Sequence, residues 1–263
     1  IRDVAPSRGL GDVYKRQLTG LVNSPNKCDK DKQPVRTSIF YINDFHGKSI
    51  NIERTMTASN AFDNFTPSKP EDRLKFSSGD IQLGEIEKVN QVAVAGQNAL
   101  HVMASAMGNH EYDMPKSVHK IIPDMKYRLL ACNIDIRPEY PLSKKVEKSY
   151  IQEVNGHKYG VIGTSPTDLI SRLKYSRLFE KHEIHNIDKT IDDIQQEVDK
   201  LKSQGINKII LLSHLGYGYD RKVAQKTDGI DVILGGHSHN LVLDVKEGEN
   251  LLYDKSGNPV VIT

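Results

Sequence analysis

Short apolar runs, each bounded by polar residues or glycine, recur along this chain and predict buried strands. Five of these runs stand directly before a cluster of polar residues that contains aspartate, asparagine or histidine. The five runs cover residues 38–42, 74–76, 102–107, 208–212 and 232–234. Each cluster therefore follows the carboxyl end of a predicted strand.

The strongest helical pattern covers residues 188–204. Gly205 follows this segment at the position where glycine commonly ends a helix. The apolar residues of the pattern recur at steps of 4, 3, 4 and 3, which places them on one face of a helix. They are Ile187, Ile191, Ile194, Val198 and Leu201.

Two other segments have a weaker helical pattern. Residues 51–65 predict a helix before Pro67, and residues 85–95 predict a second one. The side chains expected to face inward are Ile52, Met56 and Phe65 in the first helix, and Ile86, Val89 and Val94 in the second.

Further strands are predicted at 128–134, 159–163 and 230–234, and the pair Asn155-Gly156 is typical of a hairpin turn. Strands thus alternate with helices, and short hairpins interrupt the alternation. This order predicts an α/β fold.

The polar clusters carry the candidate chemistry. In open α/β sheets, ligands bind at the rim formed by the carboxyl ends of the strands. Seven side chains with nitrogen or oxygen donors gather on that predicted rim, which suggests two metal ions rather than one. The clusters are Asp44-Phe45-His46, Gly79-Asp80, Gly108-Asn109-His110-Glu111, Ser213-His214 and Gly236-His237-Ser238-His239.

Spacing within the clusters supports metal binding. Asp44 and His46 are two residues apart, as are His237 and His239, and in extended backbone such pairs point to the same face. Taken alone, each cluster has an ordinary explanation, such as a capping aspartate at Asp80 or a core histidine. Five such coincidences in one order, each after a strand, favour a metal site instead.

Composition narrows the class of protein. The 263 residues have 37% hydrophobic and 27% charged content, which is typical of a soluble globular protein. No apolar run approaches the roughly 18 residues of a membrane span. The net charge of +2 is carried by residues 1–17, so no basic patch predicts a polymeric nucleic acid as partner. The two cysteines lie far apart, and Cys132 is predicted to be buried.

The two ends of the chain differ from the rest. Residues 1–17 have no periodicity and no signal-peptide pattern, so we interpret them as a non-native or disordered tail. Residues 18–36 are polar and are interpreted as a leader. The last residues, 258–263, form a strand-like run with no turn after it, from which we expect a longer native chain.

The ordered clusters resemble those of the calcineurin-like binuclear metallophosphoesterases. The forms NDFHG, GDIQLG, GNHEYD and GGHSHN are similar to the 5′-nucleotidase and 2′,3′-cyclic-nucleotide phosphodiesterase branch of that superfamily. The resemblance covers residues 37–263. It implies a four-layer α-β-β-α sandwich with the metal site at the carboxyl ends of the strands.

The resemblance also implies a role for each candidate residue. Two divalent cations, which the donor set restricts to Mn, Zn, Fe or Co, would activate a bridging hydroxide that attacks phosphorus in line. No role follows for Glu111 or Tyr112. The implied ligands are Asp44, His46 and His239 for the first cation, Asn109, His214 and His237 for the second, and Asp80 between them, while His110 and Asp113 form the implied catalytic pair.

The implied activity is hydrolysis of a small phosphorylated substrate, with 5′-nucleotides first and 2′,3′-cyclic nucleotides second. A related sulfur-ester hydrolase, a non-catalytic metal-binding module and a truncated, inactive fragment are the alternatives. In the two-domain nucleotidases that the chain resembles, a C-terminal domain binds the nucleoside, and we expect that domain to be missing here. The resemblance further implies a periplasmic, secreted or cell-surface location.

Overall fold

The computed structural model describes residues 36–263, except for 67, 115–117 and 173–181. The predicted tail at 1–17 lies outside the described residues, and so does the predicted leader apart from its last residue. Among the described helices, none has both the length and the apolarity to cross a bilayer.

Two large sheets form the centre of the molecule. The first is parallel throughout, in the order β1 (Ser38–Ile42), β2 (Arg73–Ser77), β3 (Ala104–Ala106), β4 (Arg128–Leu130) and β6 (Val146–Glu147). The second has the order β12 (Leu251–Tyr253), β13 (Pro259–Ile262), β11 (Val232–Leu234), β10 (Ile209–Ser213), β8 (His157–Thr164) and β7 (Ser149–Val154), with antiparallel strands at both edges. A separate two-stranded sheet pairs β5 (Ile134–Asp135) with β9 (Glu183–Ile184).

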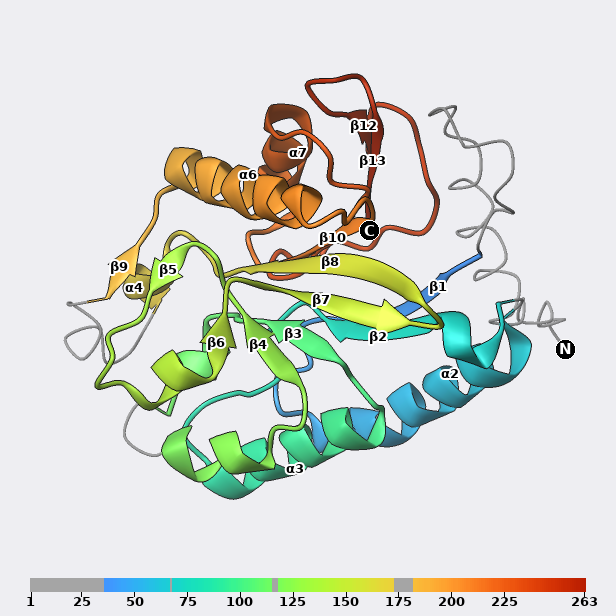
Figure 1. Ribbon diagram of the computed structural model, residues 1–263. Helices are drawn as coiled ribbons and strands as arrows, with labels where there is room; N and C mark the ends of the chain where they lie inside the picture. Colours follow the sequence, from blue (N-terminus) through green and yellow to red (C-terminus); the bar gives the residue numbers. More distant parts are fainter. Residues whose placement is uncertain (1–35, 67, 115–117, 173–181) are drawn as a thin grey trace, which may run out of the picture.

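Helices cover the outer faces of the two large sheets (Figure 1). Helices α2 (Ile52–Phe65) and α3 (Glu87–Ala99) lie against the first sheet, and α6 (Ile187–Ser203) and α7 (Tyr217–Lys226) lie against the second. A short helix, α4 (Leu169–Arg172), lies near β5. Single 3₁₀ turns fill several connections, at Ser49–Asn51, Pro70–Asp72, His110–Tyr112, Val118–Lys120, Ile122–Asp124 and Pro141–Lys144.

Three hydrophobic cores separate the four layers. Successive residues of a strand point to opposite faces of its sheet. On β4, Leu129 therefore packs towards the α3 layer, whereas Leu130 enters the core between the sheets. On β10, Leu212 enters that same central core, and Leu211 packs with Ile194 of α6. The predicted four-layer α-β-β-α sandwich is confirmed.

Several predicted elements are confirmed near their predicted bounds. Helix α6 begins one residue earlier than predicted and buries the expected apolar face. Gly205, which follows its C-terminal cap, has φ +80°. Asn155 and Gly156 connect the antiparallel pair β7–β8 with φ of 49° and 75°, as a type I′ turn requires. Cys132 is fully buried.

Three predictions about helices and strands were wrong. Phe65 was expected to face inward but is 79% exposed, because it lies 13 residues, or roughly 220° around the helix, from the inward Ile52. Ile86 is 66% exposed because α3 begins only at the next residue. The predicted strand at 128–134 is divided: β4 stays in the first sheet, while β5 pairs with β9.

Candidate metal centre

The sequence clusters meet at one rim of the sandwich. Asp44 lies two residues beyond the end of β1, and Asp80 and Asn109 lie three residues beyond the ends of β2 and β3. From the second sheet, His214 follows β10 directly and His237 lies three residues beyond β11. The prediction that the clusters follow the carboxyl ends of strands is confirmed.

The backbone at this rim is unusual. Of the seven non-glycine residues with positive φ in the described chain, five belong to the candidate ligand set. Such left-handed conformations cost energy for most residues and often occur at functional sites. The five are Asp44, His46, Asp80, His237 and His239. The expectation of extended backbone at the pairs Asp44/His46 and His237/His239 was therefore wrong, although side chains of both sheets still converge.

One group of donors forms around Asp44, whose side chain is almost buried. Its Oδ1 lies 3.2 Å from Nε2 of His239 and 3.7 Å from Nε2 of His46, and these two nitrogens are 3.2 Å apart. The backbone N–H of His237 donates to the same carboxylate. Burial opposes the ionised form, but the hydrogen bond with His46 and the charge of His214 outweigh it and lower the pKa of Asp44 to about 2.

A second group forms around His214, which is fully buried. Its Nδ1 donates to the carbonyl oxygen of Ser78 at 2.6 Å, which leaves Nε2 directed at Asp80, 3.1 Å from Oδ2. Burial disfavours the charged ring, yet the neighbouring Asp80 raises the pKa of His214 to about 9. The His237 ring stands 4.9 Å from the His214 ring, centroid to centroid. Burial and the His214 charge lower the pKa of His237.

Asp80 lies between these two groups. Its Oδ2 is 3.1 Å from the His214 ring nitrogen and 4.0 Å from Nε2 of both His46 and His110. Its Oδ1 accepts the backbone N–H of His110 at 2.9 Å. Although burial opposes ionisation, the bond to His214 lowers the pKa of Asp80. One carboxylate thus faces donors from both sheets.

The donor set fits divalent cations. Oδ1 of Asn109 is one of the buried side-chain atoms of the described residues that have no hydrogen-bond partner. A buried polar atom without a partner is costly, so this oxygen is suited to bind a cation. Oxygen and imidazole donors without thiolate suit Mn, Zn, Fe or Co. The structure brings all seven predicted ligands to this rim, and their roles as ligands stay a prediction.

The predicted catalytic pair is also assembled. Nδ1 of His110 lies 2.7 Å from Oδ2 of Asp113, and its ring is a quarter exposed. Burial lowers the pKa of His110, but the hydrogen bond with Asp113 and the charge of Asp80 raise it above its usual value. A histidine held in this way presents Nε2 to the centre and can donate a proton there.

Two glycines permit the close approach of the loops. A Cβ atom on Gly108 would stand 2.1 Å from Oδ1 of Asp80, and one on Gly79 would stand 2.7 Å from Nδ1 of His214. Gly79 also has φ +99°, a conformation that side chains rarely adopt. Gly108 therefore lets the Asp80 carboxylate approach the third cluster, and Gly79 lets the His214 ring approach the loop that carries Asp80.

Sequence reasoning missed Glu111. This residue is 1% exposed, and its carboxylate accepts backbone N–H groups from Asp80, Ile81, Gln82 and Gly108. The sequence carried no signal for this role, because Glu111 lies within the polar GNHEYD cluster. A buried carboxylate needs hydrogen-bond partners such as these four N–H groups.

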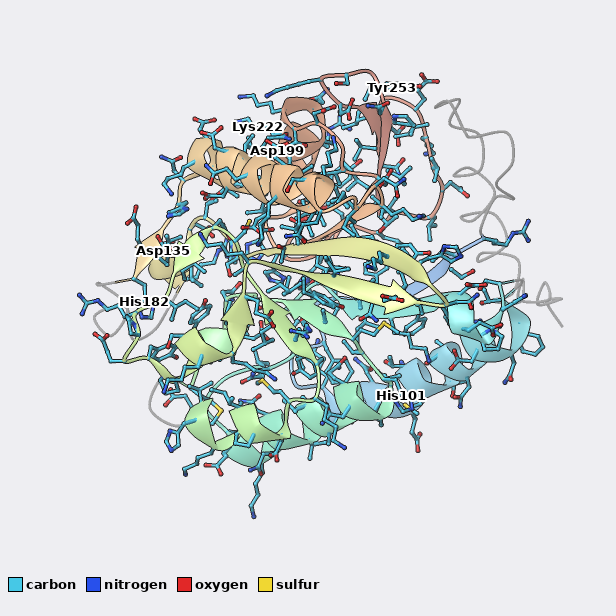
Figure 2. The ribbon with its side chains drawn as sticks, in the orientation of Figure 1. His101, Asp135, His182, Asp199, Lys222 and Tyr253 are labelled. Atoms are coloured by element: carbon cyan, nitrogen blue, oxygen red, sulfur yellow. The ribbon has the colours of Figure 1, made fainter. Side chains whose placement is uncertain are left out.

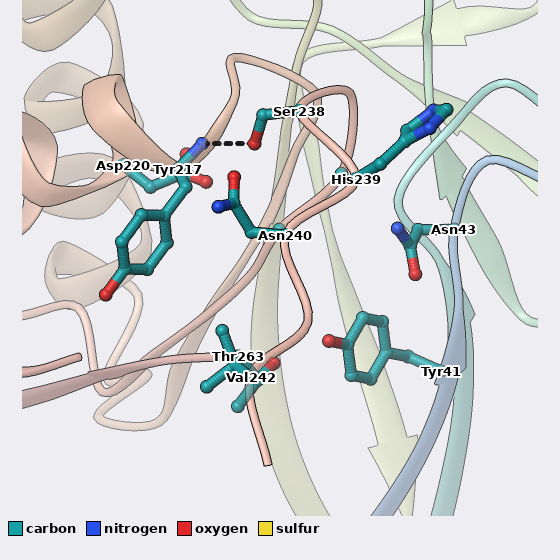
Figure 3. A pocket seen from close by; sticks show the side chains of 11 residues that line it. Tyr41, Asn43, Tyr217, Asp220, Ser238, His239, Asn240, Val242 and Thr263 are labelled. Atoms are coloured by element: carbon teal, nitrogen blue, oxygen red, sulfur yellow. Dashed lines mark hydrogen bonds between the residues drawn. The ribbon is translucent and has the colours of Figure 1, made fainter. Parts of the chain in front are cut away.

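A small pocket lies beside His239 (Figure 3). In this view Tyr41 and Asn43 stand on the side of His239, and Tyr217 stands opposite. The N–H of Tyr217 donates to Oγ of Ser238 at 2.9 Å. This bond ties α7 to the loop that carries the last two histidines.

The histidines outside the clusters do not join the centre. His101 and His182 lie at different margins of the molecule (Figure 2). His185 approaches Asp135 and Glu183 in a second group of possible ligands. However, Nζ of Lys189 lies 2.8 Å from Nε2 of His185, where a cation would have to bind. His101 and His119 are exposed and His157 is half-buried, whereas His182 and His185 are buried.

Comparison with known proteins gives one family. The family model described as calcineurin-like phosphoesterase matches residues 37–241. The human 5′-nucleotidase is 33% identical over 153 residues, which are 55% of this chain and 25% of that protein. The chain thus spans about a quarter of the length of this curated relative.

Solved structures show the same fold. The 5′-nucleotidase precursor from Thermus thermophilus superposes with a TM-score of 0.67 at 22% identity, over 86% of this chain and 48% of that one. The NAD nucleotidase of Haemophilus influenzae superposes with a TM-score of 0.68 at 24% identity, over 86% and 44% of the two chains.

Proposed function

Because the chain belongs to the calcineurin-like phosphoesterase family, we propose that it hydrolyses phosphate esters of nucleotides with the help of two divalent cations. The leading substrates are 5′-nucleotide monoesters, as the names of its 5′-nucleotidase relatives suggest. An extracytoplasmic location, also inferred from resemblance, stays a prediction.

The position of Asp80 carries this proposal. Its Oδ2 faces His46 of one donor group and His214 of the other, as a carboxylate shared by two cations must. Asp44, His46 and His239 would hold the first cation, and Asn109, His214 and His237 the second. When bound, the two cations would supply an acidified water and neutralise charge on the phosphoryl oxygens.

The chain's own residues would handle protons and orientation. His110 presents Nε2 to the centre, 4.0 Å from Oδ2 of Asp80, and is placed to protonate the leaving alkoxide or to hydrogen-bond a phosphoryl oxygen. Asp113 holds Nδ1 of the ring, which fixes the tautomer and favours the charged form.

The test is metal-restored hydrolysis. The 263-residue chain is stripped with a chelator, given Mn²⁺, Co²⁺ or Zn²⁺, and assayed with AMP, a 2′,3′-cyclic nucleotide and bis-p-nitrophenyl phosphate. We expect two cations per chain by elemental analysis and release of phosphate from AMP that depends on added metal. Preference for the cyclic substrate would reassign the chain to the diesterase branch, and a folded chain that binds no cation would refute the proposal.

A further inference from the structure

The loop that carries Asp80 is held by side chains from outside the loop. Five consecutive backbone N–H groups, from Asp80 to Gly84, each donate to such a side chain. Asp80 donates to Glu111 Oε2 at 3.0 Å, Ile81 and Gln82 donate to Glu111 Oε1 at 2.8 and 3.3 Å, and Leu83 and Gly84 donate to Asn90 and Asp113.

The other side of this loop supports the first ligand cluster. The carbonyl oxygen of Gly79 accepts the N–H of Asp44 at 3.1 Å, and the carbonyl oxygen of Asp80 accepts the N–H of His46 at 2.8 Å. The loop therefore forms a backbone ladder with residues 44–47. Any shift of residues 79–81 would move Asp44 and His46 as well.

Glu111 connects this ladder to the third cluster. Its Oε2 also accepts the N–H of Gly108 at 2.7 Å, so one carboxylate joins the backbone of two motif loops. Each carboxylate oxygen accepts two N–H donors, and the side chain is 1% exposed. Hydrogen bonds to a buried carboxylate are strong because the acceptor is charged, and four of them fix the orientation of the side chain and of its partners.

We propose that Glu111 is a positioning residue of the metal centre. It fixes the loop that carries Asp80 relative to Gly108 and so sets the position of Asp80 between the two donor groups. The inference rests on the proposed function, since it concerns the same centre. Partners outside the ligand shell commonly tune metal sites in this way.

The carboxylate is required because all four partners are donors. In Glu111→Gln, one oxygen becomes an NH₂ group that faces two backbone N–H donors. Two hydrogen bonds are then lost and two donors are brought together, while the size of the side chain is kept. We expect the loop to shift and the Asp80 carboxylate to move with it.

The experiment compares the metal-stripped full chain with Glu111→Gln by Co²⁺ titration calorimetry and by the visible spectrum of the Co²⁺-loaded protein. The variant should bind Co²⁺ roughly 10–100-fold more weakly and show altered d–d bands, since a ligand has moved. The control is Glu197→Gln on α6. Glu197 is also nearly buried, but it contacts Ser149 and Lys200 instead of the rim, so its variant should bind Co²⁺ as the wild type does.

The outcomes separate the two hypotheses. If the wild type binds no cation, the proposed function fails. If the wild type binds and Glu111→Gln has the same affinities and spectrum but a lower melting temperature, Glu111 only stabilises the fold and the inference is wrong. If Glu111→Gln does not fold, Glu111→Asp keeps the charge but is one methylene shorter. Its Co²⁺ affinity should fall, and wild-type affinity would contradict the inference.

Discussion

The two sheets contribute to the candidate centre in different ways. On the first sheet, backbone hydrogen bonds and the buried Glu111 hold the Asp80 loop, and the Asp80 side chain is only 3% exposed. On the second sheet, His214 is fully buried, but the side chain of His239 is 61% exposed. Beyond His239 the chain exposes Leu241 to 81%.

This difference suggests a division of labour. On the first sheet, the backbone groups of the loop that carries Asp80 are already paired in hydrogen bonds. The geometry of this loop is therefore fixed before any cation binds. The second sheet provides three histidines, of which His214 is buried, His237 is half-buried and His239 is exposed. Loss of Asp80 should therefore affect both cations, whereas loss of His239 should affect one.

The largest effect is expected for Asp80→Asn. The variant keeps the shape of the side chain but removes the charge that both donor groups share. Bound metal should fall from two cations per chain to fewer than one, and hydrolysis should fall to the rate without added metal. Elemental analysis after gel filtration measures this, with the exposed Asp192→Asn as control. Retention of two cations would contradict the shared role of Asp80.

His110→Ala should leave metal binding intact and impair only the catalytic step. Both cations should be retained, and kcat should fall by roughly 10²–10⁴, the usual contribution of a general acid. Steady-state kinetics with AMP provide the measurement, and His119→Ala, which removes an exposed histidine, should have no effect. An unchanged kcat would exclude His110 from the reaction.

His239→Ala tests the contribution of the exposed histidine of the second sheet. Because this side chain contacts Asp44 and His46 but not the His214 group, we expect one cation to be lost and the other to stay. A two-step calorimetric titration should collapse to a single step. Loss of both cations would show that both metal sites depend on His239, as both are expected to depend on Asp80.

The smallest effect concerns Asp220 of α7, whose carboxylate is fully buried and bonded to Ser213. Burial raises the pKa of Asp220 to about 7, above the ordinary 3.8. Its protonated form therefore stabilises the fold fully below about pH 4, and this contribution is lost as the pH rises to about 7. The loss is about 1–4 kcal/mol, at about 1.4 kcal/mol per pKa unit.

Urea unfolding in EDTA, from about pH 4 to about pH 8, measures this contribution. Asp220→Asn should lack the pH-dependent loss of stability, so the curves of variant and wild type should converge at low pH and diverge at high pH. Parallel curves would show that Asp220 does not titrate in this range.

Periodicity predicted those elements whose local pattern agrees with their packing. The apolar face of α6 is continuous over its length, so its bounds were nearly right. Helix α7 was not predicted, because it contains Gly218 and buries only Asp220, Val223 and Ala224. Phe65 misled because an aromatic residue was assumed to face inward, although its angle around α2 points away from the sheet.

The candidate ligands could be predicted because their residue types and their places after strands are visible in the sequence. Their left-handed backbone was not, since conformation there is imposed by the ladder between residues 44–47 and 79–81. The role of Glu111 was not predicted either. Three of its four partners are backbone N–H groups of a loop about 30 residues earlier, and such groups leave no trace in side-chain identity.

The left-handed ligand residues imply a trade-off between activity and stability. Non-glycine residues in that region cost roughly 1–3 kcal/mol each, so five of them together offset an amount comparable to the net stability of a typical domain. Glycine at these positions would relieve that strain but would remove the ligand side chains. The strain is therefore a cost of placing the candidate ligands at the rim, and burial in the three cores must outweigh it.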